Sequence, residues 1–174
     1  SPIELLVPAY IYPGGANRAV WNQIIAAASR VGVTAIINPD NGPYMNDASA
    51  QAQYQNLAEE LHLAGGRMLG YITTGYGSKA LSAVQDEVDD YLSKYALDGF
   101  FLDEMAAALS PDDLTLNAGI YNYVKGLDSQ YRVIQNPGTI PDEAYMAEPV
   151  ADVMTMFEDT GAAFQGFAPP AWAN

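Results

Sequence analysis

Three carboxylates stand directly after apolar runs of the sequence, where they could take part in acid–base chemistry. Asp103 and Glu104 end the run at residues 99–102, and Glu158 ends a run that closes with Met156-Phe157. Glycoside hydrolysis uses one protonated acid and one ionised carboxylate that flank the bond to be broken. Two adjacent acids also fit a capped helix start, but they exceed what a cap needs. We therefore identify Asp103, Glu104 and Glu158 as candidate catalytic residues.

The same three acids could instead hold Mg²⁺ or Ca²⁺, because these ions prefer oxygen ligands. The single histidine, His62, lies inside a helix-like pattern and away from the end of any apolar run. This position indicates a structural role and disfavours histidine-based triads and zinc sites. The sequence contains no cysteine, which excludes thiol catalysis. Our preferred hypothesis needs no metal and no cofactor, and a metal-dependent hydrolase is the alternative.

Aromatic residues accompany the acids at the ends of the apolar runs. An aromatic face packs on the apolar C–H face of a pyranose, while a phenol hydroxyl forms hydrogen bonds. The tyrosines at or near these positions are Tyr10, Tyr12, Tyr44, Tyr71 and Tyr76. Any one of them could serve packing alone, but the set favours sugar over metal. No glycine motif of the sequence fits a nucleotide-binding loop.

Six apolar, β-rich runs recur along the chain and must position these side chains. They begin near residues 3, 34, 67, 98, 131 and 152. Successive starts among the first five differ by 31 or 33 residues, a length that a strand, a crossover helix and two loops can fill. The last interval is shorter and predicts an abbreviated crossover. The alternation of strand and helix predicts a parallel sheet.

Helical patterns fill the intervals between the runs. Apolar residues at helical spacing predict helices around residues 20–31, 54–61 and 80–95. A fourth helix is predicted to begin at Ser110-Pro111, with a capping serine and a proline in its first turn. The acids at residues 86–90 mostly lie off the apolar stripe of the third helix. We interpret them as a solvent-facing surface rather than as a metal site.

The ends of all six runs carry polar, aromatic or turn-forming residues, which favours a barrel over an open sheet. An open sheet needs functional loops only at its switch point, whereas a barrel brings every strand end to one rim. A closed barrel of this type has eight strands and about 250 residues. We therefore expect an α/β fold of the (β/α)8 TIM-barrel type. Residues 1–174 are expected to form one C-terminally shortened domain that lacks the last two strands.

The charge balance excludes several classes of partner. Seven basic residues face 21 acidic ones, and the formal net charge is −14. Such a surface repels nucleic acid and anionic membranes, whose binding depends on Lys and Arg. No apolar run approaches the roughly 18 residues of a membrane span, and no signal peptide is visible. We expect no nucleic-acid partner and no membrane insertion.

Several motifs along the chain form a specific set, although none is specific alone. They are Leu6-Val7-Pro8-Ala9-Tyr10-Ile11-Tyr12-Pro13 with Trp21, Ile37-Asn38-Pro39-Asp40-Asn41-Gly42-Pro43, Gly70-Tyr71-Ile72-Thr73-Thr74-Gly75-Tyr76-Gly77, Asp98-Gly99-Phe100-Phe101-Leu102-Asp103-Glu104, Asn136-Pro137-Gly138-Thr139, Phe157-Glu158 and Pro169-Pro170-Ala171-Trp172. On these motifs the chain resembles the Spherulin-4 family, which is related to glycoside hydrolase family 135 and more distantly to the endo-polygalactosaminidases. Members normally continue past the Pro-Pro-aromatic region into two further strands.

The resemblance implies a secreted or cell-surface glycosidase that cuts within an amino-sugar polymer of the galactosaminogalactan type. It assigns the family's acidic residues to Asp103, Glu104 and Glu158. By analogy with barrel glycosidases, Glu104 would be the general acid and Glu158 the opposing carboxylate. We extend substrate binding to Tyr10, Asn38, Asp40, Tyr71, Tyr76 and Asn136. A non-catalytic glycan-binding protein would keep the same tyrosines and remains a rival hypothesis.

Overall fold

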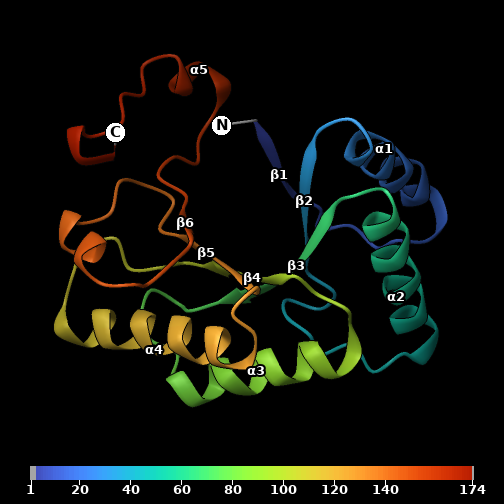
Figure 1. Ribbon diagram of the computed structural model, residues 1–174, viewed down its shortest axis with the longest axis horizontal. Helices are drawn as coiled ribbons and strands as arrows, with labels where there is room; N and C mark the ends of the chain where they lie inside the picture. The colour runs from blue at the N-terminus through green and yellow to red at the C-terminus, as the bar shows by residue number, and fades with distance from the viewer. Residues whose placement is uncertain (1–2, 174) are drawn as a thin grey trace. The chain divides into compact units, whose positions relative to one another are not determined.

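In the computed structural model, which describes residues 3–173, six strands alternate with helices (Figure 1). The strands are β1 (Glu4–Pro8), β2 (Gly32–Ile37), β3 (Arg67–Thr73), β4 (Gly99–Asp103), β5 (Arg132–Asn136) and β6 (Val153–Met154). The helices are α1 (Arg18–Ala28), α2 (Ala48–Leu63), α3 (Leu81–Lys94), α4 (Pro111–Leu127) and α5 (Gly161–Phe164), with 3-10 turns η1 (Gly15–Asn17), η2 (Glu143–Ala147) and η3 (Ala171–Ala173).

The strands follow one another through the sheet in chain order. The pairings of β1 with β2, β2 with β3, and β5 with β6 are parallel. The six predicted strands and four predicted helices are thereby confirmed, as is the short last crossover, which carries only η2. The fold is α/β with six βα units of the TIM-barrel type, as the sequence predicts. No helix in the described part of the chain is long and apolar enough to cross a membrane.

The chain forms two compact units. Unit 1 comprises Ser1–Ile72 and Asp86–Phe100, and unit 2 comprises Thr73–Gln85 and Phe101–Asn174. In unit 1, α1 contacts β2 and α2, and both helices lie beside the strands (Figure 1). Residues 33–37 of β2 are all buried, as expected of a parallel strand covered on both faces.

Tyrosines form part of the interior of unit 1. The ring of Tyr54 lies edge-on to the ring of Tyr95, with 5.8 Å between centroids, and Tyr91 lies 6.0 Å from Tyr95. Burial raises the pKa of Tyr54 and of Tyr95 to about 12. These side chains are therefore neutral phenols at physiological pH and act as large, weakly polar core residues.

One acid of α3 contradicts the interpretation of residues 86–90 as a solvent-facing surface. Glu87 is only 5% exposed, and its carboxylate accepts a hydrogen bond from the phenol of Tyr44. Burial, followed by the charge of Glu87, raises the pKa of Tyr44. Glu87 lies three residues after Val84 and four before Tyr91, so it belongs to the buried stripe of the helix.

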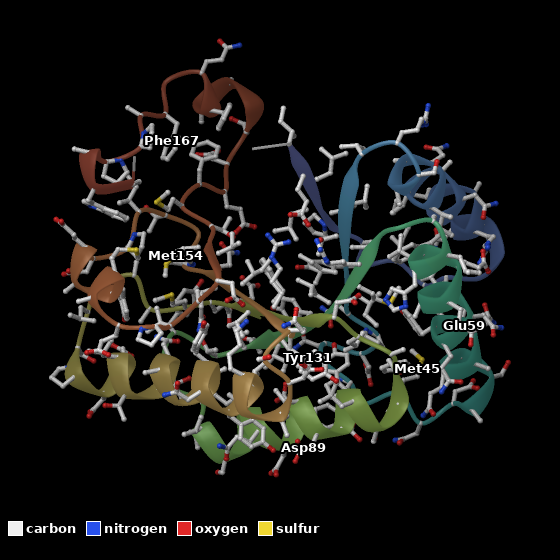
Figure 2. All side chains as sticks on the ribbon, in the orientation of Figure 1. Met45, Glu59, Asp89, Tyr131, Met154 and Phe167 are labelled. Atoms are coloured by element: carbon white, nitrogen blue, oxygen red, sulfur yellow. The ribbon has the colours of Figure 1, made fainter. Side chains whose placement is uncertain are left out.

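Unit 2 is built around α4, which runs along β5 (Figure 1). A small core forms from Met105, Tyr145 and Val150, with the partly buried Met154 of β6 packed against it (Figure 2). The predicted start of α4 is confirmed, because the backbone N–H of Asp113 donates to Ser110 Oγ at 3.1 Å. This cap satisfies one of the backbone N–H groups that lack a partner within the first turn of α4.

Aspartates immediately before two of the strands hold those strands in register. In unit 1, the backbone N–H of Asp98 donates to the carbonyl of Met68 at 2.8 Å. Asp98 Oδ2 in turn accepts from the N–H of Met68 at 2.7 Å and lies 2.8 Å from His62 Nε2. His62 thus contacts the aspartate that precedes β4. This contact is structural, as the position of His62 in the sequence indicates.

Unit 2 repeats this arrangement before β6. The backbone N–H of Asp152 donates to the carbonyl of Val133 at 2.8 Å, and Asp152 Oδ2 accepts from the N–H of Val133 at 2.8 Å. Lys125 Nζ lies 2.7 Å from the same carboxylate oxygen. Each aspartate therefore satisfies both backbone groups of one residue on the neighbouring strand.

Removing either carboxylate should destabilise the fold, because Met68 and Val133 are fully buried and their N–H groups would lose an acceptor. We expect Asp98→Ala and Asp152→Ala each to lower the free energy of unfolding by about 1–3 kcal/mol in urea denaturation. The matched control is Asp86→Ala on the exposed face of α3, with a change within about 0.5 kcal/mol. If Asp98→Ala unfolded with the same urea midpoint as wild type, the role of Asp98 in holding the strands in register would be contradicted.

Candidate functional site

The three candidate catalytic acids all belong to unit 2. Asp103 is the last residue of β4, Glu104 follows it, and Glu158 lies four residues beyond β6. The preceding residues Phe101 and Leu102 are buried, whereas Asp103 and Glu104 are partly exposed and Glu158 is exposed. The apolar strand therefore ends where its carboxylates can reach solvent.

Asn136, the last residue of β5, bridges two of these acids. Its Nδ2 donates to Asp103 Oδ1 at 2.9 Å and to Glu158 Oε2 at 2.8 Å. Its Oδ1 accepts from the backbone N–H of Gly138 at 3.0 Å, which defines the end of the amide that faces the acids. The side chain of Asn136 is 4% exposed. Both amide hydrogens of this buried side chain are therefore committed to carboxylate oxygens.

Glu104 occupies an unusual backbone conformation. Its φ of 56° lies in the left-handed region, which costs a non-glycine residue roughly 1–3 kcal/mol at a strained site. Its carbonyl accepts from the N–H of Tyr76 at 2.7 Å and from Thr74 Oγ1 at 2.8 Å. On its side chain, Glu104 Oε2 accepts from the hydroxyl of Thr73. The last residue of β3 and the residues that follow it thus hold both the carboxylate and the backbone of Glu104.

The turn after β3 presents Tyr76 to solvent. Gly75, Tyr76 and Gly77 are consecutive left-handed residues, with φ of 57°, 53° and 85°. A Cβ at Gly77 would collide with Asp113 Oδ1 in the first turn of α4, so glycine is required there. The side chain of Tyr76 is 66% exposed. Its ring is therefore accessible to a ligand, while its backbone N–H holds the carbonyl of Glu104.

Four predicted substrate-binding residues belong to unit 1. The rings of Tyr10 and Tyr71 meet edge-to-face at 5.4 Å, with Tyr10 44% exposed and Tyr71 buried. Asn38 Oδ1 accepts from the N–H of Gly42 at 2.8 Å, and the backbone N–H of Asp40 donates to the carbonyl of Gly42 at 3.1 Å. Asn38 therefore braces its own turn, while Tyr10 offers an exposed aromatic surface.

The other two tyrosines singled out in the sequence make packing contacts. Tyr12 lies edge-on to Tyr54 at 6.2 Å, and Tyr44 donates to Glu87. The predicted site residues therefore fall into two sets, one in each unit. Unit 2 brings together Asp103, Glu104, Tyr76, Asn136 and Glu158, and unit 1 holds Tyr10, Asn38, Asp40 and Tyr71.

Sequence reasoning missed Thr73 and Thr74, which contact Glu104 through their hydroxyls. The available signal was their position, since Thr73 ends β3 and Thr74 directly precedes a Gly-Tyr-Gly turn. The structure also offers no arrangement of three His, Asp or Glu side chains able to hold a metal ion among residues 3–173.

Parallel βα units with carboxylates at the strand ends define an α/β protein of the TIM-barrel type. The chain belongs to the Spherulation-specific family 4 (Spherulin4), whose family model matches residues 4–173. The resemblance drawn from the sequence motifs is thereby confirmed.

A curated relative is Spherulin-4 of Physarum polycephalum, which is 40% identical over 163 residues. That alignment covers 93% of this chain and 46% of the relative, so the chain spans about half the length of this protein.

Two solved structures have a similar fold. Aspergillus clavatus Sph3, solved in complex with GalNAc, matches with a TM-score of 0.82 and 29% identity, over 95% of this chain and 69% of that one. The O-GlcNAc hydrolase of Thermobaculum terrenum matches with a TM-score of 0.55 and 14% identity, over 82% of this chain and 37% of that one. The second likeness concerns the fold alone.

The Asn136 bridge predicts a salt-dependent loss of stability in Asn136→Asp. This change replaces a donor by a third carboxylate between Asp103 and Glu158, and the ionised groups repel one another. Because Asp103 is partly exposed and Glu158 is exposed, added salt screens this repulsion. We expect the variant to be about 1–3 kcal/mol less stable than wild type at low salt and pH 7, with the gap narrowing in urea denaturation as NaCl is added.

The control for this measurement is Asn22→Asp on the exposed face of α1, where the new carboxylate lies beside Arg18. Its stability should stay near that of wild type across the same range of salt concentration. A deficit in Asn136→Asp that does not change with salt would show that the loss arises from packing and not from charge.

Proposed function

We propose that this chain is a glycoside hydrolase that cuts within an amino-sugar polysaccharide. The observation that carries the proposal is the carboxylate cluster of unit 2, in which Asn136 bridges Asp103 and Glu158 and Thr73 holds Glu104. A pair of carboxylates, one acting as acid and one as nucleophile or base, is the usual equipment of glycosidases. The likeness to Sph3, solved with GalNAc, supports a substrate containing N-acetylgalactosamine or galactosamine.

The hydrogen bonds suggest a division of roles among the three acids. An amide N–H donates to an ionised carboxylate oxygen, so the Asn136 bridge suits Asp103 and Glu158 as ionised groups. Glu104 receives no hydrogen bond from Asn136 among the described contacts. We assign the general acid to Glu104 and the opposing carboxylate to Glu158. Asp103 would then orient the amino or N-acetyl group of the sugar.

The proposed reaction is a hydrolysis. Glu104 gives its proton to the glycosidic oxygen, and the bond between that oxygen and the anomeric carbon breaks. The hydroxyl group of a water molecule becomes attached to the anomeric carbon. Glu158 acts either as a nucleophile, forming a glycosyl ester that water then hydrolyses, or as a base that takes the proton of the attacking water.

The charge of the chain fits this class of substrate. A partly deacetylated galactosaminogalactan-like polymer is cationic, and the formal net charge of −14 would attract it. Long-range attraction of this kind speeds encounter and weakens with added salt. We extend the proposal to a secreted or cell-surface location, which rests on the family resemblance.

The direct test is hydrolysis of galactosaminogalactan by the wild type and by Glu104→Gln, Asp103→Asn and Glu158→Gln, with and without a chelator. We expect wild type to release oligosaccharides equally well in both conditions. Loss of an acid–base carboxyl should lower activity by about 10²–10⁴-fold for Glu104→Gln. The matched control is Glu143→Gln, an exposed acid of the same unit, and it should cut like wild type.

The alternatives give different outcomes. Equal cutting by Glu104→Gln would contradict its role as general acid. Loss of activity with the chelator would indicate a metal-dependent hydrolase. Binding of the polymer by all variants, without any cutting by wild type, would indicate a glycan-binding protein.

Tyr76 should contribute to binding of the sugar, because its exposed ring lies on the turn that holds Glu104. We expect Tyr76→Ala to raise KM for the polymer by about threefold to tenfold, from the loss of one aromatic contact. Tyr76→Phe keeps the ring and should stay within about twofold of wild type. A wild-type KM for Tyr76→Ala would exclude the ring from the binding surface.

A further inference from the structure

The residues that end β3 and follow it act on Glu104 as one structural unit. The backbone N–H of Thr74 donates to the carbonyl of Asp103 at 2.9 Å, and that of Tyr76 donates to the carbonyl of Glu104 at 2.7 Å. The hydroxyl of Thr74 also contacts the Glu104 carbonyl at 2.8 Å. Two successive carbonyls after the apolar strand are therefore held by one short segment, which compensates the left-handed backbone of Glu104.

The side chain of Thr73 acts on the carboxyl group itself. Thr73 Oγ1 accepts from the backbone N–H of Gly75 at 3.1 Å, and it contacts Glu104 Oε2. A hydroxyl carries a single hydrogen. The Gly75 N–H occupies one of the two lone pairs of this oxygen, and Glu104 Oε2 is the only acceptor that the described contacts give the Thr73 hydroxyl. The hydrogen of Thr73 is therefore directed at Glu104 Oε2.

The two carboxyl oxygens of Glu104 are therefore not equivalent. Oε2 accepts the hydroxyl hydrogen of Thr73, so it is the unprotonated oxygen of the carboxyl group. A proton carried by Glu104 must then lie on Oε1. Thr73 is partly buried. If its hydroxyl were removed, a water molecule could not take over the hydrogen bond to Glu104 without a cost in free energy.

We propose that Thr73 is a positioning residue that selects Oε1 of Glu104 as the oxygen that delivers the proton to the leaving group. The inference rests on the proposed glycosidase function, and it concerns the geometry of proton delivery rather than the identity of the acid. Thr73 itself does not touch the substrate in this scheme. Its loss should therefore slow the proton transfer and leave other steps nearly unchanged.

The test compares substrates that differ in their need for an acid. Aryl glycosides of a short N-acetylgalactosamine oligosaccharide are prepared with dinitrophenol or with phenol as the leaving group. Dinitrophenolate departs without protonation, whereas phenolate benefits from a proton. We expect Thr73→Val to lower kcat/KM for the phenyl substrate by about tenfold to a hundredfold. The dinitrophenyl substrate should lose less than about threefold, with KM little changed for both.

Two variants control for folding and for the loss of a hydroxyl as such. Thr73→Ser keeps the donor and should restore the phenyl substrate to within about threefold of wild type. Thr115→Val makes the same change at an exposed position of α4 in the same unit, where the hydroxyl contacts only the carbonyl of Pro111 among the described bonds. It should behave like wild type. If Thr73→Val does not fold, Thr73→Ala provides the same comparison.

The outcomes separate this inference from the proposed function. An equal loss on both leaving groups, or no loss on either, would overturn the role of Thr73 while wild-type cleavage upheld the glycosidase. Absence of wild-type cleavage of both substrates would overturn the proposed function and this inference with it. A loss confined to the phenyl substrate and rescued by serine would establish the positioning role.

Discussion

The site depends on one amide. Asn136 uses both hydrogens of its Nδ2 to join Asp103, at the end of β4, to Glu158, beyond β6. Two acids that would otherwise repel each other are thereby held in one place by a neutral, buried side chain. The backbone of Asn136 adds a further link, because its carbonyl accepts from the N–H of Met105 at 3.1 Å. The end of β5 thus ties together the segments that carry all three acids.

The third acid is positioned by a different device. Glu104 leaves the strand direction through a left-handed residue, and the turn after β3 stabilises this conformation through its carbonyl. That turn is itself built from left-handed residues, and Gly77 fits against Asp113 of the capped α4. The strain at Glu104 is therefore supported by a chain of contacts that ends in the ordinary capping chemistry of a helix.

Much of this arrangement could be predicted from local sequence patterns. The even spacing of apolar runs indicated the six strands, and the Ser110-Pro111 signal indicated the start of α4. The burial of Glu87 was predicted wrongly, because its charge outweighed its helical spacing to Val84 and Tyr91 in the interpretation of that helix. The bridging role of Asn136 and the φ of Glu104 were not predictable, because they depend on partners 22 to 33 residues away. An amide at a strand end carries no local signal of the groups to which it donates.

The proposed function depends on the hydrolysis of a glycosidic bond by these hydrogen-bonded carboxylates. It is tested most directly by incubating the wild-type chain with galactosaminogalactan in heavy-oxygen water and examining the products by mass spectrometry. We expect each new reducing end to carry one heavy oxygen atom, because in hydrolysis the hydroxyl group at the anomeric carbon comes from water. Intact polymer, or fragments that have lost water and carry no heavy oxygen, would contradict it.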